Sequence, residues 1–244
     1  MALWLITRSG GGMEIYYKQV VLLTGLTGIL SIIPCLWFYS RDRIARKHGG
    51  LVLPQKPWKL DLPEIILFLG MGAAFSQYAN MFVGMLQSVL NYKEYQKTMD
   101  QMTAGKSMWI LIICMGVVAP LAEEIVFRWL IYLRLRDYVR MGAAMVISGL
   151  IFGIYHGNLV QAVYAGILGM IFAYFLEISG CLWGSVLLHM GANIWSLVSP
   201  DLVSWMLQKK PMYILIMLFA LILILVYGIP YFQARAKGRT KRVL

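Results

Sequence analysis

Apolar runs long enough to cross a lipid bilayer dominate this 244-residue sequence. A transmembrane helix needs about 20 predominantly apolar residues. Seven segments approach or exceed that length: 20–39, 62–90, 107–133, 141–156, 159–178, 181–199 and 212–232. Hydrophobic residues make up 60% of the chain and charged residues only 14%, against about half and a quarter in soluble domains. The sequence therefore predicts an all-α, polytopic transmembrane bundle of about seven segments in the cell membrane.

The formal net charge of +11 is unevenly spread along the chain. Fourteen basic residues lie in three regions, 41–59, 134–140 and 235–242, and only seven lie on the other side of the predicted bundle. Cytoplasmic loops carry such an excess of lysine and arginine, so the C-terminus is expected in the cytoplasm. Basic blocks interleaved with aromatic residues are absent, so the lipid bilayer is an expected partner and nucleic acid is not. Three cysteines, Cys35, Cys114 and Cys181, lie in apolar runs without metal-type spacing and are interpreted as packing residues.

Three regions are expected along the chain. Residues 1–106 form an N-terminal region with two membrane helices, residues 107–199 a catalytic membrane core, and residues 200–244 the last helix and a basic cytoplasmic tail. Residues 1–18 lack the order of a signal peptide. A glycine run before Met13 leaves open whether Met1 or Met13 is the true start.

The third segment carries two adjacent carboxylates and an arginine within an otherwise apolar run. Ionisable groups at bilayer depth are costly and usually mark a site, a pathway or a pair. Glu124 and Arg128 are four residues apart, so they share a helix face and can neutralise each other. Glu123 points about 100° away and has no such local partner. Pro120 cannot donate a hydrogen bond to the Gly116 carbonyl and should bend the helix one turn earlier.

Two further segments carry polar residues within apolar runs. The fourth contains Phe152-Gly-Ile-Tyr-His156, and the sixth contains His189-Met-Gly-Ala-Asn193, whose two polar ends share a face. At 1.5 Å per residue from the predicted cytoplasmic ends, Glu123 lies about 20 Å deep, His156 about 24 Å and His189 about 14 Å. The third, fourth and sixth segments are therefore expected to form one site within the bilayer.

Small residues on these segments would let the helices approach closely. Gly149 and Gly153 form a GxxxG pattern that Gly157 continues, and Gly184 and Gly191 flank the first polar residue of the sixth segment. Close helix contacts are therefore expected around the predicted site.

The polar set suits attack of water on a carbonyl carbon. Glu123 can act as general base, and His156 can hold the same water or protonate the leaving amine. His189 and Asn193 can donate hydrogen bonds to the oxyanion. Alternatively, Glu123, His156 and His189 could bind zinc as a His₂Glu site with an open position for water. The sequence leaves both open, although the absence of HExxH favours a site without a cofactor.

The ordered motifs resemble a known family. Glu123-Glu124-x-x-x-Arg128, Phe152-x-x-x-His156 and His189-x-x-x-Asn193 resemble the CPBP family, which comprises the CAAX prenyl endopeptidases and the bacteriocin-processing or Abi-type membrane proteases. The resemblance covers about residues 107–199. It implies an intramembrane endopeptidase that cuts a small peptide or a membrane-associated protein precursor. It also implies that Glu123 and His156 are catalytic, that His189 and Asn193 stabilise the oxyanion, and that Glu124, Arg128 and Phe152 support them.

Two other functions are consistent with the same residues. The chain could be a non-catalytic membrane scaffold or immunity protein that keeps the polar core only for folding. An ion or proton carrier is less favoured, because the sequence shows no inverted repeat or matched pair of broken helices.

Overall fold

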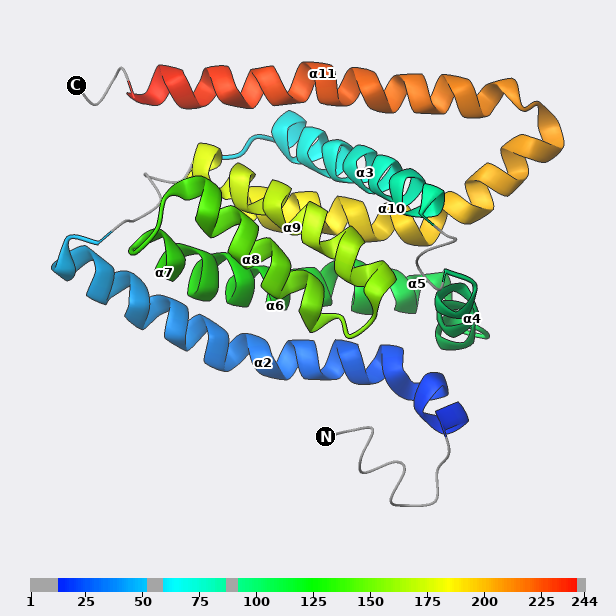
Figure 1. Cartoon of the computed structure of the whole chain (residues 1–244), viewed down its shortest axis with the longest axis horizontal. Coiled ribbons are helices and arrows are strands. Elements are labelled where there is room, and N and C mark those ends of the chain that lie inside the picture. The colour runs from blue at the N-terminus through cyan, green and yellow to red at the C-terminus, as the bar shows by residue number, and fades with distance from the viewer. Residues whose placement is uncertain (1–12, 52–58, 87–91, 241–244) are drawn as a thin grey trace.

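The computed structural model describes residues 13–51, 59–86 and 92–240, and helices account for most of them (Figure 1). The choice between Met1 and Met13 as the start concerns residues 1–12, which lie outside the described residues. In chain order the elements are α2 (Met13–Gly49), α3 (Leu62–Met85), α4 (Tyr92–Thr103), α5 (Met108–Leu111), η1 (Ile112–Val118), α6 (Ala119–Glu124), η2 (Ile125–Tyr132), α7 (Leu133–Arg136), α8 (Met141–Tyr155), α9 (Leu159–Ser179), α10 (Leu182–Lys209) and α11 (Met212–Thr240). The protein is an all-α membrane bundle, as predicted.

Five helical spans among the described residues are long and apolar enough to cross a membrane: Ile15–Gly49, Leu62–Met85, Met108–Arg136, Leu159–Ser179 and Met212–Lys237. The other two predicted segments correspond to α8 and α10. Helix α8 has 15 residues and is about 22 Å long, which is short of a typical hydrocarbon core of about 30 Å. Helix α10 has 28 residues, but its apolar run is interrupted by His189 and Asn193. The seven predicted segments thus become five apolar spans, one short helix and one more polar helix.

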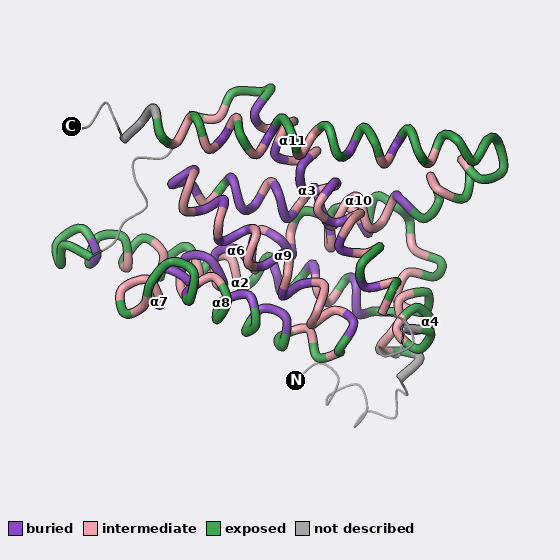
Figure 2. Tube along the Cα trace, turned by 45° about the horizontal axis from the view of Figure 1, so that its top comes forward, coloured by how far each residue is buried: buried purple, intermediate pink, exposed green. Residues whose placement is uncertain are grey.

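The long helices lie side by side, with α2 along one edge of the bundle and α11 along the opposite edge (Figure 1). Between these edges lie α3, α8, α9, α10 and the continuous helix formed by α5, η1, α6, η2 and α7. Buried residues concentrate in this middle part, whereas α2 and α11 carry few buried residues (Figure 2). The exposed side chains of α2 and α11 are largely leucine, isoleucine and aromatic residues, as expected of helix faces that contact lipid.

Glycines bring the helices around the centre into backbone contact, as predicted. A Cβ atom on Gly191 of α10 would lie 2.1 Å from the Leu69 carbonyl oxygen of α3. A Cβ atom on Gly153 of α8 would lie 2.3 Å from the Ala162 carbonyl oxygen of α9. Gly157 does not continue this row, because it has a φ of 73° in the turn between α8 and α9. Only glycine fits the first two positions without moving a helix.

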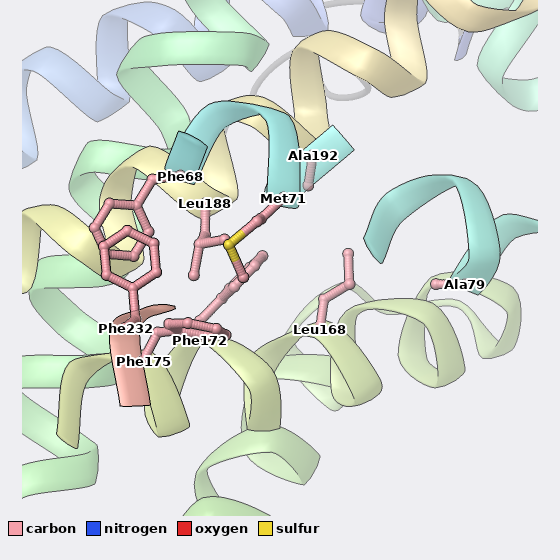
Figure 3. Packing of buried hydrophobic residues seen from close by; sticks show 9 residues of the cluster. All are labelled: Phe68, Met71, Ala79, Leu168, Phe172, Phe175, Leu188, Ala192 and Phe232. Atoms are coloured by element: carbon pink, nitrogen blue, oxygen red, sulfur yellow. The ribbon is translucent and has the colours of Figure 1, made fainter. Parts of the chain in front are cut away.

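An aromatic cluster joins α3, α9, α10 and α11 (Figure 3). The rings of Phe68 and Phe232 stack with centroids 4.0 Å apart, and Phe175 packs edge-on against both. Leu188, fully buried, belongs to the same cluster and directly precedes His189 on α10. The rotation of α10 about its axis is therefore fixed by apolar packing next to the predicted site.

Ionic contacts fix the ends of α2 and α9 against the region around α7. The buried Arg46 guanidinium binds both carboxylate oxygens of Asp137, with N–O distances of 2.9 and 2.7 Å. The Tyr132 hydroxyl donates to Glu177 of α9 at 2.6 Å, and Arg136 pairs with the same carboxylate. Such bidentate and shared contacts are geometrically specific, so they hold the helix that carries Glu123 in register with its neighbours.

We predict that Gly191→Ala destabilises the protein, because the added methyl group must push α10 away from α3. Overpacking of this kind costs about 1–3 kcal/mol, and thermal unfolding in detergent would measure it. Gly142→Ala is the matched control, since a Cβ atom there meets nothing within 4 Å. Equal unfolding temperatures for the two variants would contradict the close contact.

Candidate active site

The helix that carries the two adjacent glutamates is not a regular α-helix. Glu123 and Glu124 end the short α6, which is preceded by the π-helical η1 and followed by the π-helical η2. Within η1 the Ala119 N–H donates to the Cys114 carbonyl, five residues earlier. The sequence analysis expected a regular α-helix here and did not predict the π-helical turns; the bend expected at Pro120 of α6 stays a prediction. Single π-helical turns are uncommon and often occur at functional sites.

Glu124 and Arg128 form the predicted buried pair. The Arg128 Nε atom lies 3.0 Å from Glu124 Oε2, and both side chains are 0% exposed. The guanidinium carbon lies 4.7 Å from the centroid of the Phe152 ring and 5.6 Å from that of Phe172. Its Nη1 atom donates to Ser148 at 3.4 Å. The positive charge is therefore neutralised by one carboxylate and covered by two aromatic faces.

Glu124 also binds His189, a contact that the sequence analysis missed. The His189 Nδ1 atom lies 3.0 Å from Glu124 Oε1, and the buried imidazole stacks on Phe172 with centroids 4.8 Å apart. An ionised carboxylate can only accept, so Nδ1 carries a proton and Nε2 is left to face the site. Nothing in the sequence spacing reports this contact, since the two residues lie on separate helices.

Glu123 is the acid without a charge partner on its own helix, as expected. Its Oε2 atom lies 3.7 Å from His189 Nε2, and 19% of its side chain is exposed. Glu123 therefore lies beside the buried imidazole of His189 while remaining partly exposed.

His156 lies at the C-terminal end of α8, where Gly157 turns the chain toward Asn158, the N-cap of α9. Its Nδ1 atom lies 2.8 Å from the Phe152 carbonyl oxygen and must donate to it. The neutral ring therefore presents the lone pair of Nε2. Phe152 contacts both imidazoles, with centroid distances of 4.9 Å to His156 and 5.5 Å to His189. Within the described chain, no hydrogen bond or ion pair joins His156 to Glu123.

Asn193 makes a hydrogen bond that the sequence analysis did not predict. Its Nδ2 atom donates to the Met115 carbonyl oxygen of η1 at 2.8 Å. One of the two N–H groups of the amide is thus committed to the backbone, and the role predicted for Asn193 at the oxyanion stays a prediction.

Tyr155 is a neighbour of the site that no sequence feature singled out. Tyr155 is 64% exposed, and its ring lies 5.2 Å from that of Phe127 and 5.7 Å from that of His156. It therefore borders His156 at the surface of the protein.

The alternative prediction is a zinc site formed by Glu123, His156 and His189. No group of three histidine, cysteine, aspartate or glutamate residues in the described part of the chain is placed so that it could hold a metal ion. Zinc binding by Glu123, His156 and His189 stays a prediction, and no reaction step is drawn through a metal.

Comparisons with known proteins cover the same part of the chain. Residues 105–195, which include every predicted site residue, match the sequence model of the Rce1-like family, described as type II CAAX prenyl endopeptidases. This match confirms the resemblance found in the motifs. A curated protein of Bacillus subtilis (strain 168), named "Putative membrane peptidase YdiL", is 28% identical over 101 residues. These residues span 41% of this chain and 41% of that relative. No solved structure matches.

We predict that Glu124→Gln destabilises the protein by about 3–5 kcal/mol, because it leaves the fully buried Arg128 without a countercharge. The double variant Glu124→Gln/Arg128→Met should regain much of that loss, since both charges are then absent. Thermal unfolding of the single and double variants in detergent would measure the difference. A single variant as stable as the unmodified protein would contradict the buried pair.

Proposed function

We propose that this chain is an intramembrane endopeptidase that hydrolyses a peptide bond in a small peptide or a membrane-associated protein precursor. The observation that carries the proposal is the Glu123 carboxylate 3.7 Å from the Nε2 atom of a buried His189 whose Nδ1 atom is bound by Glu124. The match to the Rce1-like family over the same residues supports a membrane protease.

The proposed mechanism depends on whether a proton lies on Glu123 or on the Nε2 atom of His189. When Glu123 is ionised and His189 is doubly protonated, the site offers a general base and a charged N–H donor together. When the proton lies on Glu123, the site offers neither a general base nor a charged N–H donor. Glu124 stabilises the active state, because its carboxylate faces the Nδ1 proton of the imidazolium.

Hydrolysis then follows from these groups. Glu123 takes a proton from water as the water oxygen bonds to the substrate carbonyl carbon. The Nε2 lone pair of His156 accepts a hydrogen bond from the second hydrogen, which stays on that oxygen. The carbonyl oxygen becomes an oxyanion that accepts hydrogen bonds from His189 Nε2 and the second N–H of Asn193. Collapse of the intermediate breaks the carbon–nitrogen bond, and the proton held by Glu123 passes to the leaving amine.

The surroundings of the site fit a reaction within the membrane. The protein is a multi-pass membrane protein with apolar outer faces, so its substrate must reach a polar site surrounded by hydrocarbon. We place the C-terminus in the cytoplasm from the distribution of basic residues. A peptide or membrane protein and the lipid bilayer are then the partners of the site.

We predict that Glu123→Gln lowers cleavage by about 10²–10⁴-fold, the usual loss when a general base is removed. Comparative peptidomics of cells that carry the unmodified protein or this variant would measure the loss and reveal the substrate. Glu94→Gln, an acid exposed on α4, is the matched control and should leave cleavage unchanged.

The same comparison separates the enzyme from the non-catalytic scaffold or immunity protein. For a scaffold, Glu123→Gln would leave both the peptide pool and the cellular phenotype unchanged while the protein remains in the membrane. That result would refute the assignment of Glu123 as the base.

A further inference from the structure

We infer that Pro120 is a positioning residue for Asn193. Because proline has no N–H, it leaves a backbone carbonyl without a helical donor, and Asn193 donates to that carbonyl instead. The inference rests on the proposed function, in which Asn193 donates to the oxyanion. Its structural part can be tested without any substrate.

The π-helical register of η1 identifies the open carbonyl. Ala119 donates its N–H to the Cys114 carbonyl, five residues earlier. If this register continued by one residue, position 120 would donate to the Met115 carbonyl, but Pro120, the second residue of α6, has no N–H. Met115 therefore takes its donor from another helix, and Asn193 Nδ2 supplies it at 2.8 Å.

This hydrogen bond fixes the orientation of the Asn193 amide. A carbonyl oxygen can only accept, so the nitrogen end of the amide must face Met115. Because the amide is planar, fixing one N–H also fixes the direction of the other. Asn193 follows His189 by one turn on the same face of α10. Its second N–H is therefore held on the side of α10 from which His189 would donate to the oxyanion.

Packing keeps the two helices at the distance that this bond requires. A Cβ atom on Gly116 would lie 2.9 Å from the Ile194 side chain, so η1 and α10 are in close contact beside the Asn193 bond. A donor fixed in this way need not reorient when charge develops on the substrate, which is the basis of oxyanion stabilisation. The competing role of the bond between Asn193 and Met115 is to join η1 and α10, so that its loss would affect stability alone.

The amide signals of Asn193 give the first test. The chain contains four asparagines, Asn80, Asn91, Asn158 and Asn193, so selective ¹⁵N labelling gives few side-chain signals, and Asn193→Ala identifies the relevant pair. In the unmodified protein, one of the two Asn193 protons should be shifted downfield by its bond to Met115. Pro120→Ala returns an N–H to that carbonyl, so the Asn193 amide should be released and its two proton signals should converge.

Unchanged Asn193 signals in Pro120→Ala would overturn the inference. Should that variant fail to fold, the unmodified protein still decides, because an Asn193 pair without a downfield member would also overturn it.

Kinetics with a peptide identified from the Glu123→Gln comparison give the second test. Asn193→Ala should lower kcat about 100-fold, as expected for loss of one oxyanion donor. Pro120→Ala should lower kcat about 10- to 100-fold through misalignment, with KM little changed. The double variant should be no slower than Asn193→Ala, because both changes remove the same contribution.

Pro230→Ala makes the same chemical change within another membrane helix, α11, and should leave kcat unchanged. An unchanged kcat in Pro120→Ala with a released amide would show a plain interhelical bond and overturn the inference. If Glu123→Gln cleaves like the unmodified protein, the proposed function fails, whereas the amide signals still decide whether Pro120 orients Asn193.

Discussion

Neutralisation of charge inside the membrane is the constraint on which this structure depends. A carboxylate and a guanidinium that are both 0% exposed persist in an apolar bundle only because they lie 3.0 Å apart and are covered by aromatic rings. Glu124 uses its first oxygen for His189 and its second for Arg128. One buried acid thus joins the central helix to α10 and sets which nitrogen of the imidazole faces the site.

Local spacing predicted the parts of this site that lie on one helix. The pairing of Glu124 with Arg128 follows from their separation by four residues, and the close packing at Gly153 and Gly191 follows from small residues in apolar runs. The helical structure of α8 and α9 and their approximate bounds could likewise be predicted from hydrophobicity and turn residues. These features depend on neighbours in sequence, which is why one sequence was enough.

Contacts between helices could not be predicted in the same way. The bond from Glu124 to His189 depends on the rotation of α10, which is set by the cluster around Phe68 and Leu188. The acceptor of Asn193, the Met115 carbonyl, lies in the π-helical η1, which an apolar run does not distinguish from an α-helix. Both contacts arise from the arrangement of helices that lie far apart in the chain.

The polarity of α10 has a consequence for how the protein is built. His189 and Asn193 leave this helix less hydrophobic than the five apolar spans, so alone in lipid it would expose two unsatisfied polar side chains. Its partners, Glu124 and the Met115 carbonyl, belong to a helix synthesised earlier, and α3, its closest backbone neighbour at Gly191, is earlier still. Stable insertion of α10 therefore depends on helices already in the bilayer. The residues proposed for chemistry thus also require that these helices insert before α10.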